Sequence, residues 1–95
     1  MSILEIIRFR PLPGATDALL AGRAAAVAAL TDRFGMEHST LCHAEDGTWV
    51  DVMRFPSAAA ADEALAHEME LVAFAGWVAN VEAVLSRERV TVQAP

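Results

Sequence analysis

The sequence predicts a single α+β domain in which two helices cover one face of a four-stranded antiparallel sheet. Segments rich in β-branched and aromatic residues alternate with two alanine-rich segments whose apolar residues recur every three or four positions. The segments follow the order β-α-β-β-α-β, and a chain of 95 residues has room for one core. We therefore expect residues 1–95 to form one domain.

The first two predicted elements are a strand over residues 2–10 and a helix that begins near Thr16. The strand segment SILEIIRFR ends at PLPG, because two prolines and a glycine do not continue a strand. We expect Thr16 to act as the N-cap of the helix and Gly35 to end it. The apolar stripe of this helix is expected to contain Leu20, Arg23 or Ala24, Val27, Leu30 and Phe34.

A β-hairpin is predicted over residues 36–55, with the sequence EDG at its tip. Two registers are compatible with this tip. If Asp46–Gly47 is a two-residue turn, Cys42 lies opposite Asp51. If EDG is a three-residue loop with a left-handed glycine, the register shifts by one residue and Leu41 lies opposite Asp51. The first register sets His38 opposite Phe55, and the second sets His43 opposite Trp49, so one histidine lies on the face of Trp49 in either case.

A second helix, capped by Ser57, is predicted over residues 57–72, and a short helical turn with Phe74 and Trp77 precedes a last strand over residues 84–93. This order is the split βαβ arrangement of ferredoxin-like domains, which places the first and third strands at the centre of the sheet. The second helix is expected to point Ala61, Ala64, Leu65, Met69 and Val72 inward, and Asp62, Glu63, Glu68 and Glu70 toward solvent.

The two helices can cover only one face of this sheet, although both faces of its central strands are rich in apolar residues. Such an open face would exceed the apolar patch that soluble monomers usually expose. The simplest cover is a second copy of the chain, sheet against sheet, in a two-fold homodimer. The residues expected on this open face are Ile7, Phe9, Trp49, Met53 and Phe55.

The composition excludes several classes of protein. The net charge of −6 and the lack of a basic stripe argue against a nucleic-acid-binding protein. No apolar run approaches the roughly 18 residues of a membrane span. The single cysteine, Cys42, cannot form an internal disulfide, and the N-terminal segment lacks a signal-peptide pattern. We expect a cytoplasmic protein.

Several segments resemble a known family. The opening EIIRFRPLPG, the hairpin DGTWVDVMRFPS before an alanine-rich helix, and the closing VEAVLSRERVTVQ are similar to the dimeric α/β-barrel superfamily, and most of all to its antibiotic biosynthesis monooxygenase-like members. The resemblance spans the whole chain. It implies a ferredoxin-like protomer, two sheets that close a barrel across the dimer, and a ligand cavity between sheet and helices or within the barrel.

The activities known in this superfamily include cofactor-free oxygenation of polycyclic aromatics, haem degradation, lactone isomerisation and chlorite chemistry. Fold alone does not choose among them. The chain has no tyrosine, so the tyrosine hydroxyl of the aromatic-oxygenating members has no counterpart here. Its one asparagine, Asn80, follows the second helix, whereas haem-degrading members carry an asparagine on the first strand.

Two carboxylates are the candidate catalytic residues. Asp51 lies between Trp49 and Met53 on one face of its strand, and the first strand offers Glu5 on the same face. A buried carboxylate must be protonated, paired or hydrogen-bonded. Asp51 or Glu5 is therefore either a base that lines an aromatic pocket, or the partner of an arginine or hydroxyl across the dimer with a purely structural role.

The expected ligand is a small apolar or aromatic molecule, bound without metal or flavin. The three histidines lack the spacing of metal ligands, so no metal site is expected. The alternative to a ligand-binding enzyme is a non-catalytic binding or assembly module whose polar residues only fix the dimer register. The expected ligand-binding residues are Phe9, Trp49, Met53, Trp77 and His38.

Overall fold

The computed structural model describes residues 1–95. Its elements follow the predicted order, with the second helical segment divided into three short pieces. The elements are β1 (Ile3–Pro11), α1 (Thr16–Phe34), β2 (His38–His43), β3 (Trp49–Phe55), α2 (Ala58–His67), the 3₁₀ turn η1 (Glu68–Glu70), α3 (Val72–Val78) and β4 (Val81–Thr91).

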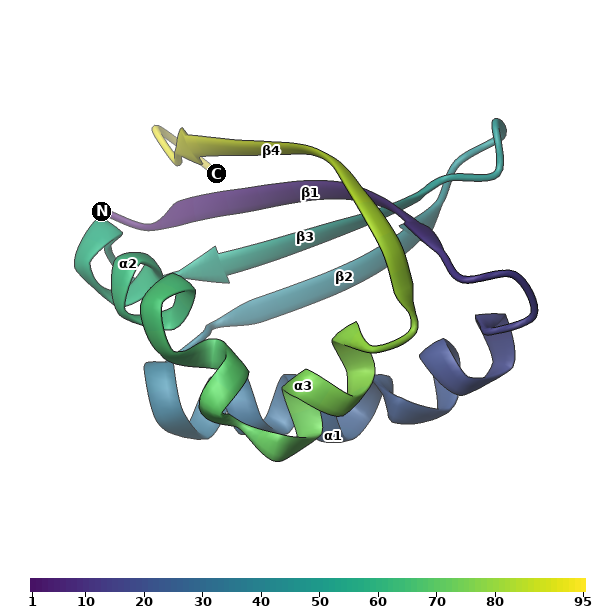
Figure 1. Ribbon diagram of the computed structural model, residues 1–95. Helices are drawn as coiled ribbons and strands as arrows, with labels where there is room; N and C mark the ends of the chain where they lie inside the picture. The colour runs from purple at the N-terminus through teal and green to yellow at the C-terminus, as the bar shows by residue number, and fades with distance from the viewer.

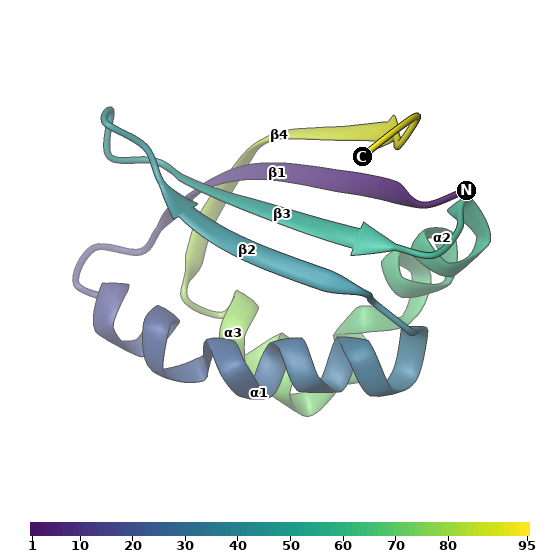
Figure 2. The same cartoon turned by 180° about the vertical axis from the view of Figure 1, so that it is seen from behind.

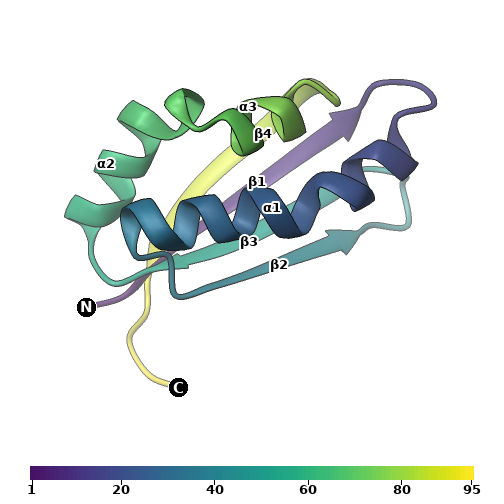
Figure 3. The same cartoon turned by 90° about the horizontal axis from the view of Figure 1, so that it is seen from below.

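The four strands form one antiparallel sheet in the order β2-β3-β1-β4 (Figure 1). The predicted ferredoxin-like arrangement, with the first and third strands at the centre, is confirmed. All helices lie on one face of the sheet, and the opposite face is bare in the view from behind (Figure 2). From below, α1 runs beside the segment formed by α2, η1 and α3, and β2 lies on the outer side of α1 (Figure 3).

The helix ends follow from single residues. Gly35 ends α1 in the left-handed region (φ 69°), and its N–H donates to the carbonyl of Thr31. The hydroxyl of Ser57 accepts from the N–H of Ala60 at 3.1 Å, which caps α2 as predicted. The expected cap at Thr16 is wrong: α1 begins at that residue, and no side chain caps it.

The sequence-based assignment of the two sheet faces is wrong. Ile7, Phe9, Trp49, Met53 and Phe55 were expected on the open face, but all five point toward the helices. Pairing in the sheet sets Phe9 opposite Trp49, and both are buried in the core. Apolar residues occur on both faces of β1 and β3, so the period of the pattern does not show which face the helices cover. The larger side chains take the side that the helices can bury.

The open face carries smaller aliphatic side chains. At its centre Ile6 pairs with Val52, while Arg8 at the edge donates from Nη1 to the hydroxyl of Thr48 at 2.7 Å. No element of the chain covers this face. The prediction of an apolar open face therefore stands with different residues, namely Leu4, Ile6, Val50, Val52 and Val90, all partly exposed in the single chain.

The core lies between the sheet and the helices. Helix α1 contributes Leu19, Ala26, Leu30 and Phe34, whereas the expected Leu20 is 51% exposed, so its stripe is displaced by one residue at the N-terminal end. In the second helical segment, Leu65, Met69 and Val72 were expected inside, but Leu65 and Met69 are half exposed and Val72 is 89% exposed. This leaves room between that segment and β4.

Candidate functional site

A cavity of about 100 Å³ lies between the sheet and the η1–α3 segment, with β4 along one side. This volume exceeds the roughly 10–15 Å³ that a cavity needs to hold one water molecule. Most of its lining is apolar, and three ionisable side chains reach it. The lining residues are Ile7, Phe9, Met53, Met69, Phe74, Trp77, Val78, Val81 and Val84, together with Asp51, Glu68 and Arg87.

Trp77 forms a fixed wall of this cavity. Its indole N–H donates to the carbonyl of Leu19 at 2.9 Å, and its ring meets the edge of Phe9 with centroids 5.7 Å apart. Gly22 of α1 faces the same ring, because a Cβ at this position would lie 3.5 Å from it. The only polar atom of Trp77 is therefore already used, and a ligand would meet the apolar part of the ring.

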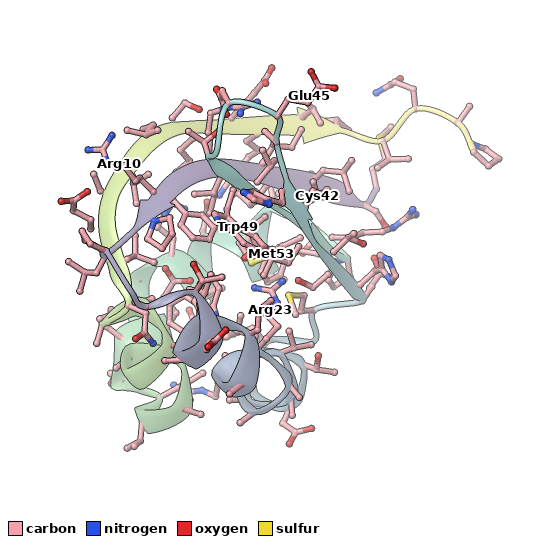
Figure 4. The ribbon with its side chains drawn as sticks, turned by 90° about the vertical axis from the view of Figure 1, so that its right-hand side faces the viewer. Arg10, Arg23, Cys42, Glu45, Trp49 and Met53 are labelled. Atoms are coloured by element: carbon pink, nitrogen blue, oxygen red, sulfur yellow. The ribbon has the colours of Figure 1, made fainter.

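Asp51 is held in an ion pair on the floor of the cavity. Its Oδ2 and Oδ1 accept from Nη1 and Nη2 of Arg23 at 2.8 and 2.7 Å, and the guanidinium also donates to the hydroxyl of Ser39. The same hydroxyl donates to Oδ1 of Asp51 at 3.3 Å. Figure 4 shows Arg23 rising from α1 toward the sheet, near Met53.

This arrangement gives Asp51 both an arginine and a hydroxyl as partners, within one chain rather than across a dimer. Asp51 is 3% exposed, and two parallel hydrogen bonds to a guanidinium are among the strongest charge-assisted contacts. The guanidinium also lies 5.0 Å from the ring centre of Trp77. The geometry favours a structural role in which Asp51 holds Arg23 against the cavity wall.

Glu5 is likewise buried and paired. Its Oε1 accepts from Nε of Arg89 at 2.7 Å and lies 2.7 Å from Nη2 of the same guanidinium, and Nη1 of Arg89 donates to Asp62 at 2.7 Å. The carboxylates of Asp62 and Glu5 raise the pKa of the Arg89 guanidinium. Glu5 lines a separate space of about 10 Å³ rather than the main cavity. It shares the face of Asp51 as predicted, but it is not free to act as a base.

Glu68 is the ionisable residue that sequence reasoning placed wrongly. It was expected on the exposed side of a continuous helix, but α2 ends at His67 and the 3₁₀ turn directs Glu68 to the cavity. Burial raises the pKa of Glu68 from 4.5 to about 7; Arg87 lowers it, and the charges of Glu5 and Asp51 raise it further. No ion pair of the molecule includes Glu68.

The raised pKa of Glu68 predicts how stability changes with pH. The folded-state pKa of about 7 lies above the ordinary value of 4.5, so ionisation of Glu68 weakens the folded state as pH rises through this window. We expect Glu68→Gln to be as stable as the wild type below about pH 4.5. Between about pH 4.5 and 7 the variant should become progressively more stable than the wild type, and the difference should stay constant at higher pH. Urea unfolding at several pH values measures this difference.

Glu45→Gln serves as the control for this prediction. Glu45 is exposed on the hairpin and takes part in no ion pair, so its replacement should leave the pH dependence of stability unchanged (Figure 4). A difference between wild type and Glu68→Gln that stays constant from acid to neutral pH would contradict the burial of Glu68.

The hairpin adopts the second of the two predicted registers. Gly47 is left-handed (φ 89°), Leu41 lies opposite Asp51, and His43 lies opposite Trp49. The rings of His43 and Trp49 stack with centroids 4.3 Å apart. Trp49 therefore packs under an exposed histidine at the end of the sheet and does not line the cavity.

His38 lies away from the cavity, contrary to its expected place among the ligand-binding residues. It pairs with Arg54 on the open face of the sheet, and its ring lies 3.1 Å from the hydroxyl of Thr40. The one-residue shift in the hairpin register moves His38 to this face. Of the expected site residues, the cavity brings together Asp51, Phe9, Met53 and Trp77, but not Glu5, Trp49 or His38.

The structure contains no group of three or more His, Cys, Asp or Glu side chains arranged to hold a metal ion. None of its helices combines the length and the hydrophobicity needed to cross a bilayer.

No sequence-family model and no curated protein matches the chain. Several solved structures do. A Chloroflexus aurantiacus J-10-fl protein provisionally named an antibiotic biosynthesis monooxygenase superimposes with a TM-score of 0.74 at 13% identity, over 100% of this chain and 96% of that one. The chain has the fold of the antibiotic biosynthesis monooxygenase-like proteins.

Two further structures share this fold over nearly their whole length. Rv0793 from Mycobacterium tuberculosis gives a TM-score of 0.70 at 23% identity, over 100% of this chain and 98% of that one. SnoaB, a cofactor-independent oxygenase from Streptomyces nogalater, gives 0.69 at 19% identity, over 99% and 95%. The resemblance inferred from the sequence is thereby confirmed at the level of the fold.

Proposed function

We propose that the protein binds a small apolar or aromatic molecule in the cavity beside Trp77 and transforms it in the manner of a cofactor-independent monooxygenase. The observation that carries the proposal is the cavity itself, whose apolar walls converge on a few ionisable groups, as is typical of small-molecule sites. The shared fold with SnoaB, which is named a cofactor-independent oxygenase, supports the reaction class.

The size of the cavity limits what it can hold. About 100 Å³ is below the roughly 300–1,000 Å³ of sites for drug-sized ligands. An apolar cavity on the order of 150 Å³ is known to hold a benzene ring. We therefore propose that one ring enters the cavity, and that any larger part of the molecule extends past the half-exposed side chains of Met69 and Val84.

We further propose that the protein is a cytoplasmic homodimer, with the open sheet faces packed together. The apolar centre of that face, at Ile6 and Val52, supports this arrangement, because burying such side chains is worth about 1.5–3 kcal/mol each. The free thiol of Cys42 suits a reducing compartment.

One observation favours the alternative of a non-catalytic binding or assembly module. Both oxygens of Asp51 are occupied by Arg23, and Glu5 is occupied by Arg89, so the two carboxylates expected to act as bases have structural partners. Under this alternative the cavity would still bind a ligand, but without turnover.

Titration with 2-indanone, an aromatic ring fused to a small ketone, tests the proposed binding. The probe offers one ring for the cavity, and its carbonyl group can quench tryptophan fluorescence. We expect saturable quenching with one site per chain. A linear, non-saturating decrease in fluorescence would contradict the proposal.

A further inference from the structure

Two side chains of opposite charge face the cavity without a partner. Glu68 reaches it from η1, and Arg87 reaches it from β4, where it pairs with Ile7 in the sheet and points to the same face. No ion pair or side-chain hydrogen bond in the molecule includes either of them. Oppositely charged groups at one apolar cavity that do not contact each other leave room for something between them.

The other charged groups around the cavity are already paired. Asp51 on β3 is bound by Arg23 of α1, and Glu5 on β1 is bound by Arg89 of β4. These pairs engage the carboxylates of Asp51 and Glu5, although both charges still raise the pKa of Glu68. Glu68 and Arg87 therefore remain as the acid and the cation that are available to a bound molecule.

Their position is at the entrance of the cavity rather than at its floor. Glu68 is partly buried, and Arg87 is exposed, as are the neighbouring Met69 and Val84. Phe9 and Trp77 are 2% and 5% exposed, so a ring seated against them lies deeper in the cavity, and its outer substituents lie at the level of Glu68 and Arg87.

We propose that Glu68 is the catalytic base of this site and that Arg87 stabilises the anion it creates, with a weakly acidic C–H or O–H group of the bound aromatic molecule as the proton donor. This inference rests on the proposed function, since it requires a ring in the cavity. It assigns proton transfer to Glu68 in place of Asp51.

The step is a simple proton transfer. The C–H or O–H bond of the ligand breaks, the proton forms a new O–H bond with the carboxylate of Glu68, and the electron pair stays on the ligand as an enolate or phenolate. The guanidinium of Arg87 offers several N–H donors to that oxygen.

The titration of Glu68 suits this role. A base works best when its pKa lies near the working pH, and burial raises the pKa of Glu68 to about 7. Arg87 opposes this rise, while the charges of Glu5 and Asp51 add to it. Removal of Arg87 should therefore move the midpoint of any Glu68-dependent rate to higher pH.

Hydrogen–deuterium exchange of 2-indanone in D₂O tests the proposal directly, because the C–H groups beside its ketone exchange only after a base removes the proton. We expect the protein to accelerate this exchange, with a rate that rises through about pH 7. Glu68→Gln should lower the protein-dependent rate by about 100-fold, since general base catalysis typically contributes 10²–10⁴-fold. Arg87→Gln should lower the rate and shift its midpoint upward.

Glu70→Gln is the matched control, because Glu70 lies in the same 3₁₀ turn but outside the cavity. This variant should accelerate the deuterium exchange of 2-indanone as much as the wild type does. Binding of 2-indanone to each variant is measured separately by fluorescence. Saturable binding with exchange that does not depend on Glu68 would overturn this inference and leave the proposed binding function intact. Failure of the wild type to bind the probe would contradict both.

Discussion

Replacing Arg23 by methionine is expected to destabilise the protein by about 3–5 kcal/mol, the loss typical when one partner of a buried ion pair is removed. Asp51, which is 3% exposed in the wild type, would lose its guanidinium partner and keep only the hydroxyl of Ser39 as a hydrogen-bond partner. Methionine keeps most of the side-chain volume beside Trp77, so the loss reports the charge rather than the packing. Urea unfolding at neutral pH measures it.

Arg10→Met is the matched control for this prediction. Arg10 forms an ion pair with Glu82 at 2.6 Å, but both side chains are largely exposed, and such pairs contribute about 0–1 kcal/mol. The double variant Arg23→Met with Asp51→Leu should recover much of the loss, because it removes both buried charges. If Arg23→Met is no less stable than Arg10→Met, the Arg23–Asp51 ion pair does not contribute to stability as a buried pair, which would contradict the prediction.

Replacing Val52 by glutamate is expected to convert the proposed dimer into a monomer. Val52 lies opposite Ile6 at the centre of the open face, and the two-fold symmetry of a dimer would bury two unpaired carboxylates for each substitution. A loss of at least about 3 kcal/mol of association free energy corresponds to an increase of roughly 100-fold or more in the dissociation constant. Native mass spectrometry over a concentration series measures it.

Leu20→Glu is the control for the assembly prediction, because Leu20 is a half-exposed apolar residue on the outer side of α1. This variant should dimerise like the wild type. A wild-type chain that stays monomeric at micromolar concentration would contradict the proposed dimer, and an undisturbed dimer in Val52→Glu would place its interface elsewhere.

The order of the elements could be predicted from the sequence because each change of hydrophobic period is unambiguous. The faces of the sheet could not, because Ile6 and Ile7, or Val52 and Met53, alternate with equal hydrophobicity on both sides of their strands. Their assignment depends on side-chain size, since the helices bury the large residues such as Phe9. That is a property of packing between distant segments.

Only part of the site could be predicted from the sequence. Alternation correctly grouped Asp51 with Met53, but the pairing of Asp51 with Arg23 was missed, although an arginine within an apolar helical stripe is a signal for a buried partner. Glu68 was missed because the pattern was extended as one helix, whereas the chain changes to a 3₁₀ turn after His67 and rotates the side chain inward. No residue in that segment marks the change.

The most direct test of the proposed cavity site is the 2-indanone titration repeated with single-tryptophan variants. Trp49→Phe leaves Trp77 as the only tryptophan, inside the cavity, and Trp77→Phe leaves Trp49 beneath His43, outside it. We predict saturable quenching in Trp49→Phe and almost none in Trp77→Phe. Quenching in Trp77→Phe alone, or in neither variant, would contradict a ligand site in this cavity.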